Sequence, residues 1–244
     1  MGINMTKHFM VDIETLSTAV NAAVLSIGAV EFDPFTGQIL RKFYHELDLS
    51  DQDSRHVDLN TVQWWFKQCQ ENPINFELMT KHNREKDSVE FVLHKLGEFI
   101  NGGTVYAMVR AGGYEKLAVW ACDPDFDIAI LNDLYKEHNL PSPWRYSELR
   151  SVRTVRDLAK IARVAIIRQE ANHNALDDCI RQAKEVTDLL STLHTLGENR
   201  QNLINSYNGL VACRKSNSET YLLENVDNVL YQIGKTFSLP VEVE

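Results

Sequence analysis

The sequence predicts an α/β fold in which helices flank a mixed β-sheet. Two observations lead to this class. Segments with the apolar pattern of strands alternate with segments of helical period, which is typical of a layered α/β domain. An early pair of strands is joined by a short turn, so at least one pair runs antiparallel. The 244 residues, 44% of them hydrophobic, suffice for one sizeable domain, or one domain with an extension.

The first half of the chain begins with strands. Residues 9–13, 23–32 and 39–47 are expected to form three strands, and the turn 33–37, with Pro34 and Gly37, joins the last two as a hairpin. Asp58 is placed to cap a helix that follows. That helix carries Val62, Trp65 and Phe66, and a second one, 88–100, places Phe91, Val92, Leu96 and Phe99 on its inner face.

The second half continues the alternation after a glycine-rich stretch, 101–115, that resembles an insertion. A central strand is expected at 117–121 and a helix at 125–138. A basic helix follows, and then a helix that carries Ile180, Ala183, Val186 and Leu190. Beyond residue 192 we expect two further amphipathic helices, at Leu203–Val211 and Leu222–Ile233, which form an extension (193–244) to the domain (1–192). They pack on that domain, pair with a second copy, or begin a longer architecture.

The composition excludes several classes of protein. No apolar run is long enough to span a bilayer, and the N-terminus lacks the pattern of a secretion signal, so no membrane partner is expected. The four cysteines contain no Cys-x-x-Cys pair, which indicates free thiols in a reducing cytoplasm. A net charge of −9 disfavours a coat protein that grips nucleic acid by long-range attraction, but it is compatible with an enzyme that reaches phosphate through metals.

Two carboxylates in the first strand are the most informative feature. Asp12 and Glu14 are two residues apart, and residues at i and i+2 point to the same face of a strand. Two like charges held on one face repel each other unless a cation binds them. Divalent Mg²⁺ or Mn²⁺ prefers carboxylate oxygens. The alternative is a strand end whose acids face water.

Three more residues extend this set. Asp127 is expected near the end of the central strand and in the first turn of the next helix, where its alternative role is helix capping. His173 opens a later helix, and Asp178 lies about one and a half turns further along it. Asp178 could therefore bind the same metal while His173 stays free over the reacting atom.

Together Asp12, Glu14, Asp127, His173 and Asp178 resemble the DEDDh subgroup of DnaQ-like 3′–5′ exonucleases, which have a ribonuclease H-like fold. The segments 12–16, 23–30, 61–65 and 152–154 are similar to phage and prophage exonucleases of the exonuclease A and exodeoxyribonuclease VIII-associated kind. The resemblance covers residues 9–190. One departure is Ser151, where such relatives often carry an acid.

The resemblance implies a five-stranded mixed sheet and a metal-dependent 3′–5′ exonuclease that releases nucleoside 5′-monophosphates. In this reading the four acids hold two divalent cations, and His173 takes the proton from the attacking water as general base. Its substrates would be single-stranded or frayed 3′ ends of DNA or RNA.

Substrate contacts are expected just after the first acids. By resemblance, Thr15 and Leu16 meet the terminal nucleotide, with Leu16 as a wedge. Trp64 and Trp65 point about 100° apart on a helix, so one is expected in the core while the other stacks on a base, unless both are buried. Arg153 belongs to a basic stretch that either tracks phosphates or is a solvated face; its members are Arg145, Arg150, Arg153, Arg156, Lys160, Arg163 and Arg168. In that helix Val155, Leu158, Ala159 and Ala162 fall on the other face.

Two other functions remain open at this point. The chain could be an inactive nucleic-acid-binding module, which the presence of all five functional residues disfavours. It could also be a ribonuclease H-like endonuclease, but such enzymes use an all-carboxylate set without the His-x4-Asp spacing. Nothing in the sequence distinguishes DNA from RNA.

Overall fold

The computed structural model describes residues 6–102, 116–162 and 173–216. The body of the predicted insertion, Arg163, Arg168 and the second predicted tail helix lie outside these residues. The chain divides into two compact units, Met1–Ser191 and Thr192–Glu244, and the first contains the whole sheet. No helix of the described segments combines the length and apolar character needed to cross a bilayer.

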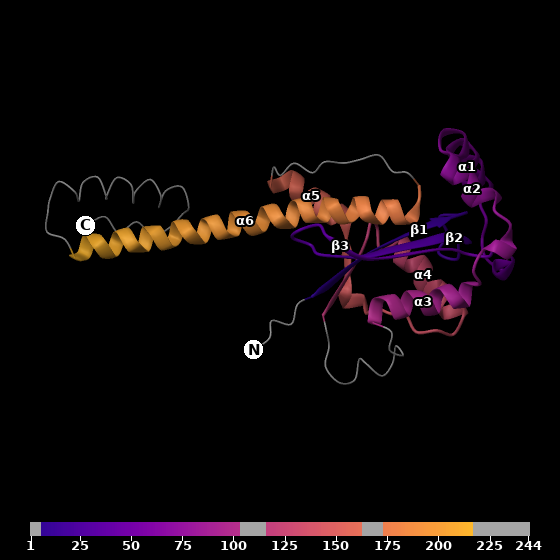
Figure 1. The fold of residues 1–244 in the computed structure, drawn as a ribbon, viewed down its shortest axis with the longest axis horizontal. Helices are drawn as coiled ribbons and strands as arrows, with labels where there is room; N and C mark the ends of the chain where they lie inside the picture. Colours follow the sequence, from indigo (N-terminus) through magenta and orange to yellow (C-terminus); the bar gives the residue numbers. More distant parts are fainter. Residues whose placement is uncertain (1–5, 103–115, 163–172, 217–244) are drawn as a thin grey trace. The chain divides into compact units, whose positions relative to one another are not determined.

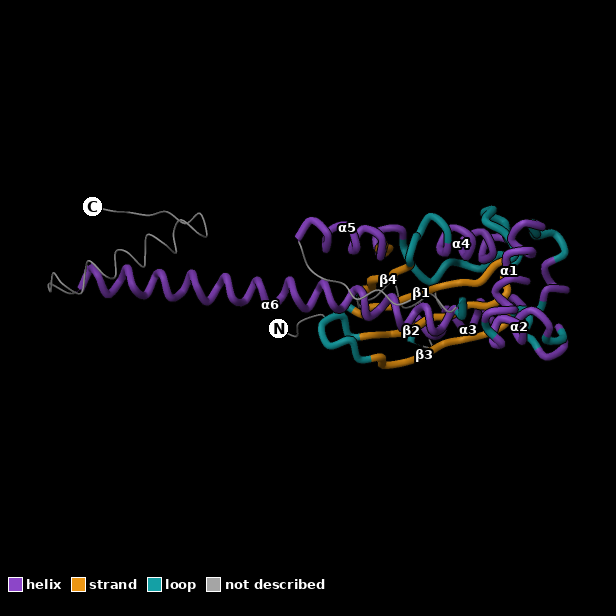
Figure 2. Tube along the Cα trace, turned by 90° about the horizontal axis from the view of Figure 1, so that it is seen from above, coloured by secondary structure: helices purple, strands orange, loops and turns teal. Residues whose placement is uncertain are grey.

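The first unit is built on a mixed five-stranded sheet, as the resemblance implied (Figures 1 and 2). Its strand order is β3-β2-β1-β4-β5. The central strand β1 (Lys7–Thr15) pairs antiparallel with β2 (Val24–Phe32) and parallel with β4 (Leu117–Ala121). At the edges, β3 (Ile39–Glu46) pairs antiparallel with β2, and β5 (Leu149–Ser151) pairs parallel with β4. The sequence pattern did not locate β5, because three residues are too short to show an alternation.

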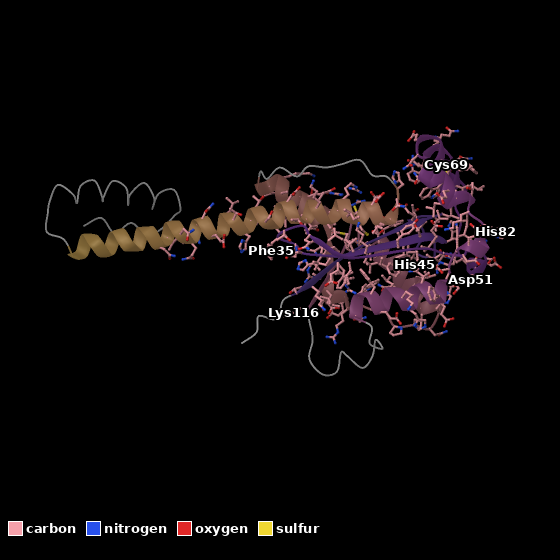
Figure 3. All side chains as sticks on the ribbon, in the orientation of Figure 1. Phe35, His45, Asp51, Cys69, His82 and Lys116 are labelled. Atoms are coloured by element: carbon pink, nitrogen blue, oxygen red, sulfur yellow. The ribbon has the colours of Figure 1, made fainter. Side chains whose placement is uncertain are left out.

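The turn of the β2–β3 hairpin is stabilised by hydrogen bonds to a side chain. The Asp33 carboxylate accepts hydrogen bonds from the backbone N–H groups of Phe35 and Thr36, at 2.8 and 2.9 Å. Gly37 has φ +73°, a conformation that suits glycine. Phe35, labelled in Figure 3, is exposed in this turn.

Helices cover both faces of the sheet, because side chains of β1 alternate between two hydrophobic clusters (Figure 1). Phe9, Val11 and Ile13 pack against α3 (Val89–Asn101) and α4 (Asp127–Glu137). Met10 packs on the other side, against α5 (Val152–Ala162) and the first part of α6 (Ala175–Ser216). The face that carries Met10 is also the face of Asp12 and Glu14.

A third cluster closes the end of the sheet near the C-terminus of β1. Leu16, Leu25, Trp65 and Leu78 pack there between the sheet and two helices. These helices are α1 (Leu59–Glu71), whose predicted N-cap Asp58 accepts from the Asn60 N–H, and α2 (Pro73–Thr80), which the sequence pattern did not locate. Short 3₁₀ helices, η1 (Leu49–Gln52), η2 (Asn83–Glu85) and η4 (Tyr146–Glu148), complete the connections.

One predicted inner-face residue is wrong. Phe91 in α3 is 44% exposed, because the buried stripe of this helix consists of Val89, Val92, Leu93, Leu96 and Ile100. Phe66 in α1, for which no face was predicted, is 61% exposed, whereas Trp65 on the same helix packs in the third cluster.

The first predicted tail helix is also not a separate element. Residues 203–211 belong to α6, which runs without interruption from Ala175 to Ser216. No proline occurs between these ends, so nothing in the covalent chain forces a break.

Candidate active site

The central strand places two acids on one face of the sheet. Asp12 and Glu14 lie near the C-terminal end of β1, and each is only 8% exposed. They are two residues apart and share the face on which Met10 packs against α6. The predicted pairing of these two carboxylates therefore has the expected geometry.

Asp127 reaches the same region from the neighbouring strand. It is the first residue of α4, which follows the C-terminal end of β4, and it is 3% exposed. Its Oδ1 accepts from the backbone N–H of Ile13 at 3.4 Å, which joins the start of α4 to β1 between the two acids.

The beginning of α6 carries the other two residues. Asn174 caps the helix, since its Oδ1 accepts from the N–H groups of Leu176 and Asp177 at 3.1 and 3.2 Å. His173 precedes the cap with φ +54°, an uncommon conformation for a residue with a side chain. Asp178 lies in the first turns of the helix and is 5% exposed.

A glycine allows α6 to approach the sheet at this point. Gly28 in β2 pairs directly with Asp12 in β1. A Cβ atom on Gly28 would lie 2.4 Å from the backbone carbonyl carbon and oxygen of Ala175. Since a Cβ cannot approach backbone that closely, only glycine permits the start of α6 to lie over the acids.

The sequence-predicted acids and histidine converge. One side-chain ligand atom from each of Glu14, His173 and Asp178 lies within 4.8 Å of the others. Burial raises the pKa of Asp12 well above its ordinary value, and the neighbouring charges of Asp127, Glu14 and Asp178 raise it further.

The other acids respond in the same way. Burial, followed by the charges of Asp178 and Asp127, raises the pKa of Glu14 well above its usual range. Burial raises the pKa of Asp127 to about 7, although backbone hydrogen bonds to its carboxylate oppose this shift. A cluster of buried carboxylates that disfavours its own ionisation is suited to hard divalent cations, which supply the missing positive charge. The donor set therefore fits a divalent metal.

His173 is half-buried beside this cluster. Burial lowers its pKa below 6.5, and Arg181 lowers it further, while Asp178 and Glu71 act in the opposite direction. Its imidazole also meets the ring of Trp64 edge to face, with centroids 4.7 Å apart. At neutral pH the ring is therefore expected to be uncharged and able to accept a proton.

A pocket of about 410 Å³ adjoins Glu14. Three of the predicted substrate residues, Thr15, Trp64 and Trp65, line it. The sequence did not single out its other lining residues, which are Ile13, Thr18, Asn60, Thr61 and Phe126. Of these, Asn60 and Thr61 lie in the first turn of the helix that the predicted cap Asp58 begins. That position was the available signal for them.

The two tryptophans have different environments. Trp65 is 1% exposed, and its indole N–H donates to the carbonyl of Thr15 at 2.8 Å, so it holds the chain just after Glu14. Trp64 is 38% exposed and borders both the pocket and His173. Trp65 is thus the core residue of the pair, and Trp64 is the one available for stacking.

Leu16 does not have the surroundings expected of a wedge. It is 6% exposed and packs among Ala23, Leu25, Trp65 and Leu78. The side chain contributes to the third hydrophobic cluster, and it is not among the residues that line the pocket.

Between residues 145 and 160, the part of the basic stretch that the structure describes, the basic side chains do not form one exposed stripe. Arg156 pairs with the buried Glu185 at 2.6 Å and is therefore internal. Arg153 is exposed and lies 3.5 Å from Asp123, while Lys160 pairs with Asp157. The prediction that Leu158 lies on the apolar side of this helix is wrong, since it is 50% exposed; Val152, Val155 and Ala159 form the buried face.

Two polar residues of α6 that the sequence did not single out contact the acids. The Gln182 amide N–H donates to Asp12 Oδ1 at 2.8 Å, and Arg181 contacts Asp178 Oδ1 at 3.0 Å. Gln182 lies one turn beyond Asp178, so the i+4 spacing was the signal for it.

Comparison with known proteins places this site in a family. The family model described as a 3′–5′ exoribonuclease Rv2179c-like domain matches residues 7–190. No significant match to a curated protein sequence is found.

Solved structures of exonucleases share the fold. The nuclease domain of 3′hExo, described as a DEDDh family member bound to rAMP, has a TM-score of 0.51 at 11% identity, over 76% of this chain and 92% of that domain. Exonuclease I of E. coli in complex with a dA16 oligonucleotide has a TM-score of 0.53 at 11% identity, over 77% of this chain. A zinc-bound complex of the same enzyme with single-stranded DNA has a TM-score of 0.55 at 10% identity, over 81% of this chain.

These identities are low, so the structural likeness establishes the fold alone. This chain spans less than half of exonuclease I, 41% and 43% in the two complexes. The family model, in contrast, covers most of the chain and includes all five converging residues. The chain therefore belongs to the Rv2179c-like family of 3′–5′ exoribonuclease domains.

Proposed function

We propose that this chain is a divalent-metal-dependent 3′–5′ exonuclease that releases nucleoside 5′-monophosphates from single-stranded or frayed 3′ ends. The observation that carries the proposal is the convergence of four buried acids and a half-buried histidine beside a pocket. Membership of an exonuclease family supports the same reaction and its direction.

The proposed metal ligands are Asp12, Glu14, Asp127 and Asp178, holding two Mg²⁺ or Mn²⁺ ions. Carboxylate oxygens are the ligands that these ions prefer. Bound divalent cations supply an activated water and neutralise the charge that develops on the phosphodiester. The raised pKa values of Asp12 and Glu14 support this role, because burial and then mutual repulsion raise them, and a bound cation would offset both.

His173 is the proposed general base. It borders Glu14 and Asp178, and its lowered pKa keeps the imidazole neutral at pH 7, as a proton acceptor must be. When the attacking water loses a proton, the neighbouring carboxylate of Asp178 would stabilise the resulting imidazolium.

The pocket beside Glu14 is the proposed site of the terminal nucleotide. Trp64 offers a half-exposed aromatic surface for a base, and such stacking contributes about 1–3 kcal/mol per base. Thr15, Thr18, Asn60 and Thr61 provide polar groups for the sugar or the base edge. The family description favours RNA ends, whereas the E. coli neighbour was solved with DNA.

The test uses matched RNA and DNA oligonucleotides, labelled at either end, with Mg²⁺ or Mn²⁺. A 5′-labelled strand should shorten in single-nucleotide steps, and a 3′-labelled strand should release labelled mononucleotide at once. His173→Ala should retain metal binding but lose most turnover, while Asp12→Ala should lose both. Degradation from the 5′ end, or no degradation by the wild-type chain with either metal, would contradict the proposal.

A circular single-stranded substrate, prepared both as RNA and as DNA, separates the rival functions. An exonuclease leaves the circle intact and degrades the linear form. An endonuclease cuts both, and an inactive binding module cuts neither.

Three finer expectations stay predictions. Residues 1–192 are proposed as the exonuclease domain and 193–244 as a helical extension. A homodimer contact through that extension, and a particular closeness to phage and prophage exonucleases, are proposed on the sequence alone.

A further inference from the structure

Two polar side chains of α6 contact acids that are proposed to bind metal: Gln182 contacts Asp12, and Arg181 contacts Asp178. Gln182 and Asp178 are four residues apart and lie on one face of the helix, toward β1. Gln182 is 2% exposed, and its Nε2 donates to Asp12 Oδ1 at 2.8 Å. This hydrogen bond joins two residues 170 positions apart, so it ties the helix to the central strand at the site itself.

The contact leaves the second oxygen of Asp12 for a cation. An amide N–H bound to Oδ1 fixes the rotation of the carboxylate and favours its charged form. When Asp12 is ionised, the amide N–H must face its carboxylate, because the reverse orientation would bring Oε1 against a carboxylate oxygen. Oε1 of Gln182 has no hydrogen-bond partner in the described residues, although it is buried. A buried acceptor without a protein donor is suited to ordered water at a hydrated ion.

Asp178 is held in a parallel way. Arg181 Nε and Nη2 lie 3.1 and 3.0 Å from Asp178 Oδ1. Arg181 in turn pairs with the buried Glu185 at 3.0 Å, and Glu185 pairs with Arg156 from α5. The guanidinium is thereby held between Asp178 and Glu185. In both Asp12 and Asp178, one carboxylate oxygen is occupied by a side chain of α6.

We infer that Gln182 is a positioning residue of the active site, which orients Asp12 for divalent-metal binding by occupying one of its two carboxylate oxygens. Arg181 has the corresponding role for Asp178. This inference rests on the proposed function and extends it to residues that touch neither the substrate nor the reacting atoms.

The variants Gln182→Leu and Gln182→Met replace the amide donor with an apolar side chain of similar size. We expect the dissociation constant for Mn²⁺, measured by calorimetric titration of the full chain, to rise about 10-fold or more. At saturating Mn²⁺, kcat on a labelled oligonucleotide should fall while KM changes little, because the pocket is not altered.

Gln52→Leu is the matched control. Gln52 is also a buried glutamine, but it bonds the backbone of Val24 in β2, at 2.8 and 2.9 Å. Its loss should lower the melting temperature without changing the Mn²⁺ affinity. If Gln182→Leu or Gln182→Met behaves like Gln52→Leu, the role of Gln182 is structural and the inference is overturned.

A measurement on the wild-type chain covers the case in which the variants do not fold. The glutamine side chains are labelled with ¹⁵N and observed by NMR. On addition of Mg²⁺ the side-chain NH₂ signals of one buried glutamine should shift, while those of Gln52 stay unchanged. If no glutamine side-chain signal responds to Mg²⁺, the inference is overturned. Wild-type protein that neither binds metal nor degrades oligonucleotides would instead contradict the proposed function.

Discussion

Burial sets the chemistry of individual residues in this site. Four acids and a histidine are withdrawn from water within one small region, and the pKa values of Asp12, Glu14 and Asp127 rise in consequence. His173 moves in the opposite direction, because burial disfavours its charged form. The acids thus require cations to ionise together, while the histidine stays a neutral base.

The pH dependence of the rate tests His173. Its pKa is lowered below 6.5, so the neutral form persists to lower pH than for a free histidine. At saturating Mn²⁺ the wild-type rate should be level around pH 7 and should fall as the pH decreases through this lowered pKa. His173→Ala should lose about 10²–10⁴-fold in kcat and also lose this limb of the profile. If His173→Ala kept the same fall in rate at low pH, that fall would belong to the titration of another group.

Trp64 links the pocket to the proposed base. Its ring lines the pocket and contacts the imidazole of His173 at 4.7 Å. Trp64→Ala should therefore raise KM by about 10-fold, from the lost stacking, and should also lower kcat because His173 loses a packing partner. Trp64→Phe should recover most of both losses.

Phe66→Ala is the control for this substitution. Phe66 lies on the same helix, is 61% exposed, and does not line the pocket. Its removal should leave both kinetic constants unchanged. Equal kinetics for Trp64→Ala and wild type would place Trp64 outside the substrate path.

At the scale of elements, the site depends on how closely α6 approaches the sheet. Gly28 faces the backbone of Ala175, and no larger residue fits between them. Gly28→Ala should displace the start of α6, and with it His173 and Asp178. We expect a stability loss of about 1–3 kcal/mol and a larger relative loss of activity, measured by denaturant unfolding and by oligonucleotide degradation.

Gly197→Ala is the comparison for this prediction. Gly197 lies inside α6 with open space around its Cα, so an added methyl meets nothing. This substitution should be neutral or stabilising by up to about 1 kcal/mol. If Gly28→Ala were equally harmless, the close approach would not constrain the site.

The elements also show what the sequence could reveal. The long strands and α1, α3 and α4 were predictable, because their apolar residues repeat with a clear period and Asp58 marks a start. β5 and α2 were not, since one has three residues and the other presents no clear apolar stripe. Phe91 was misassigned because a large apolar residue beside a buried stripe has the same local pattern as a member of it.

The candidate site was predictable to a similar degree. The acids and His173 were visible as residue types at strand ends and a helix start. Gln182 and Arg181 were not singled out. The i+4 spacing from Asp178 places Gln182 on the same helix face, but the roles of both residues depend on which side of α6 meets β1. Arg156 was misjudged for the same reason, since its partner Glu185 lies 29 residues away.

At the scale of the whole molecule, the acid cluster is a cost to stability that a bound metal would relieve. Raised pKa values in the folded state mean that the folded chain binds more protons than the unfolded chain between about pH 4 and pH 7. Their contribution to the free energy of unfolding is therefore present at low pH and is lost as the pH rises through the folded-state pKa, which for Asp127 is about 7.

Comparison with Asp127→Asn tests this effect, because groups that titrate outside the acid cluster contribute equally to both chains. Without metal, the wild-type melting temperature should fall relative to the variant between pH 5 and pH 8. At pH 8, Mn²⁺ at about 100 times its dissociation constant should stabilise the wild type by about 2.7 kcal/mol, or about 5–10 °C. The variant should gain less, since it lacks one proposed ligand. If the difference in melting temperature between the two chains did not change with pH, Asp127 would not be the group with the raised pKa. If Mn²⁺ stabilised both chains equally, Asp127 would not be a metal ligand.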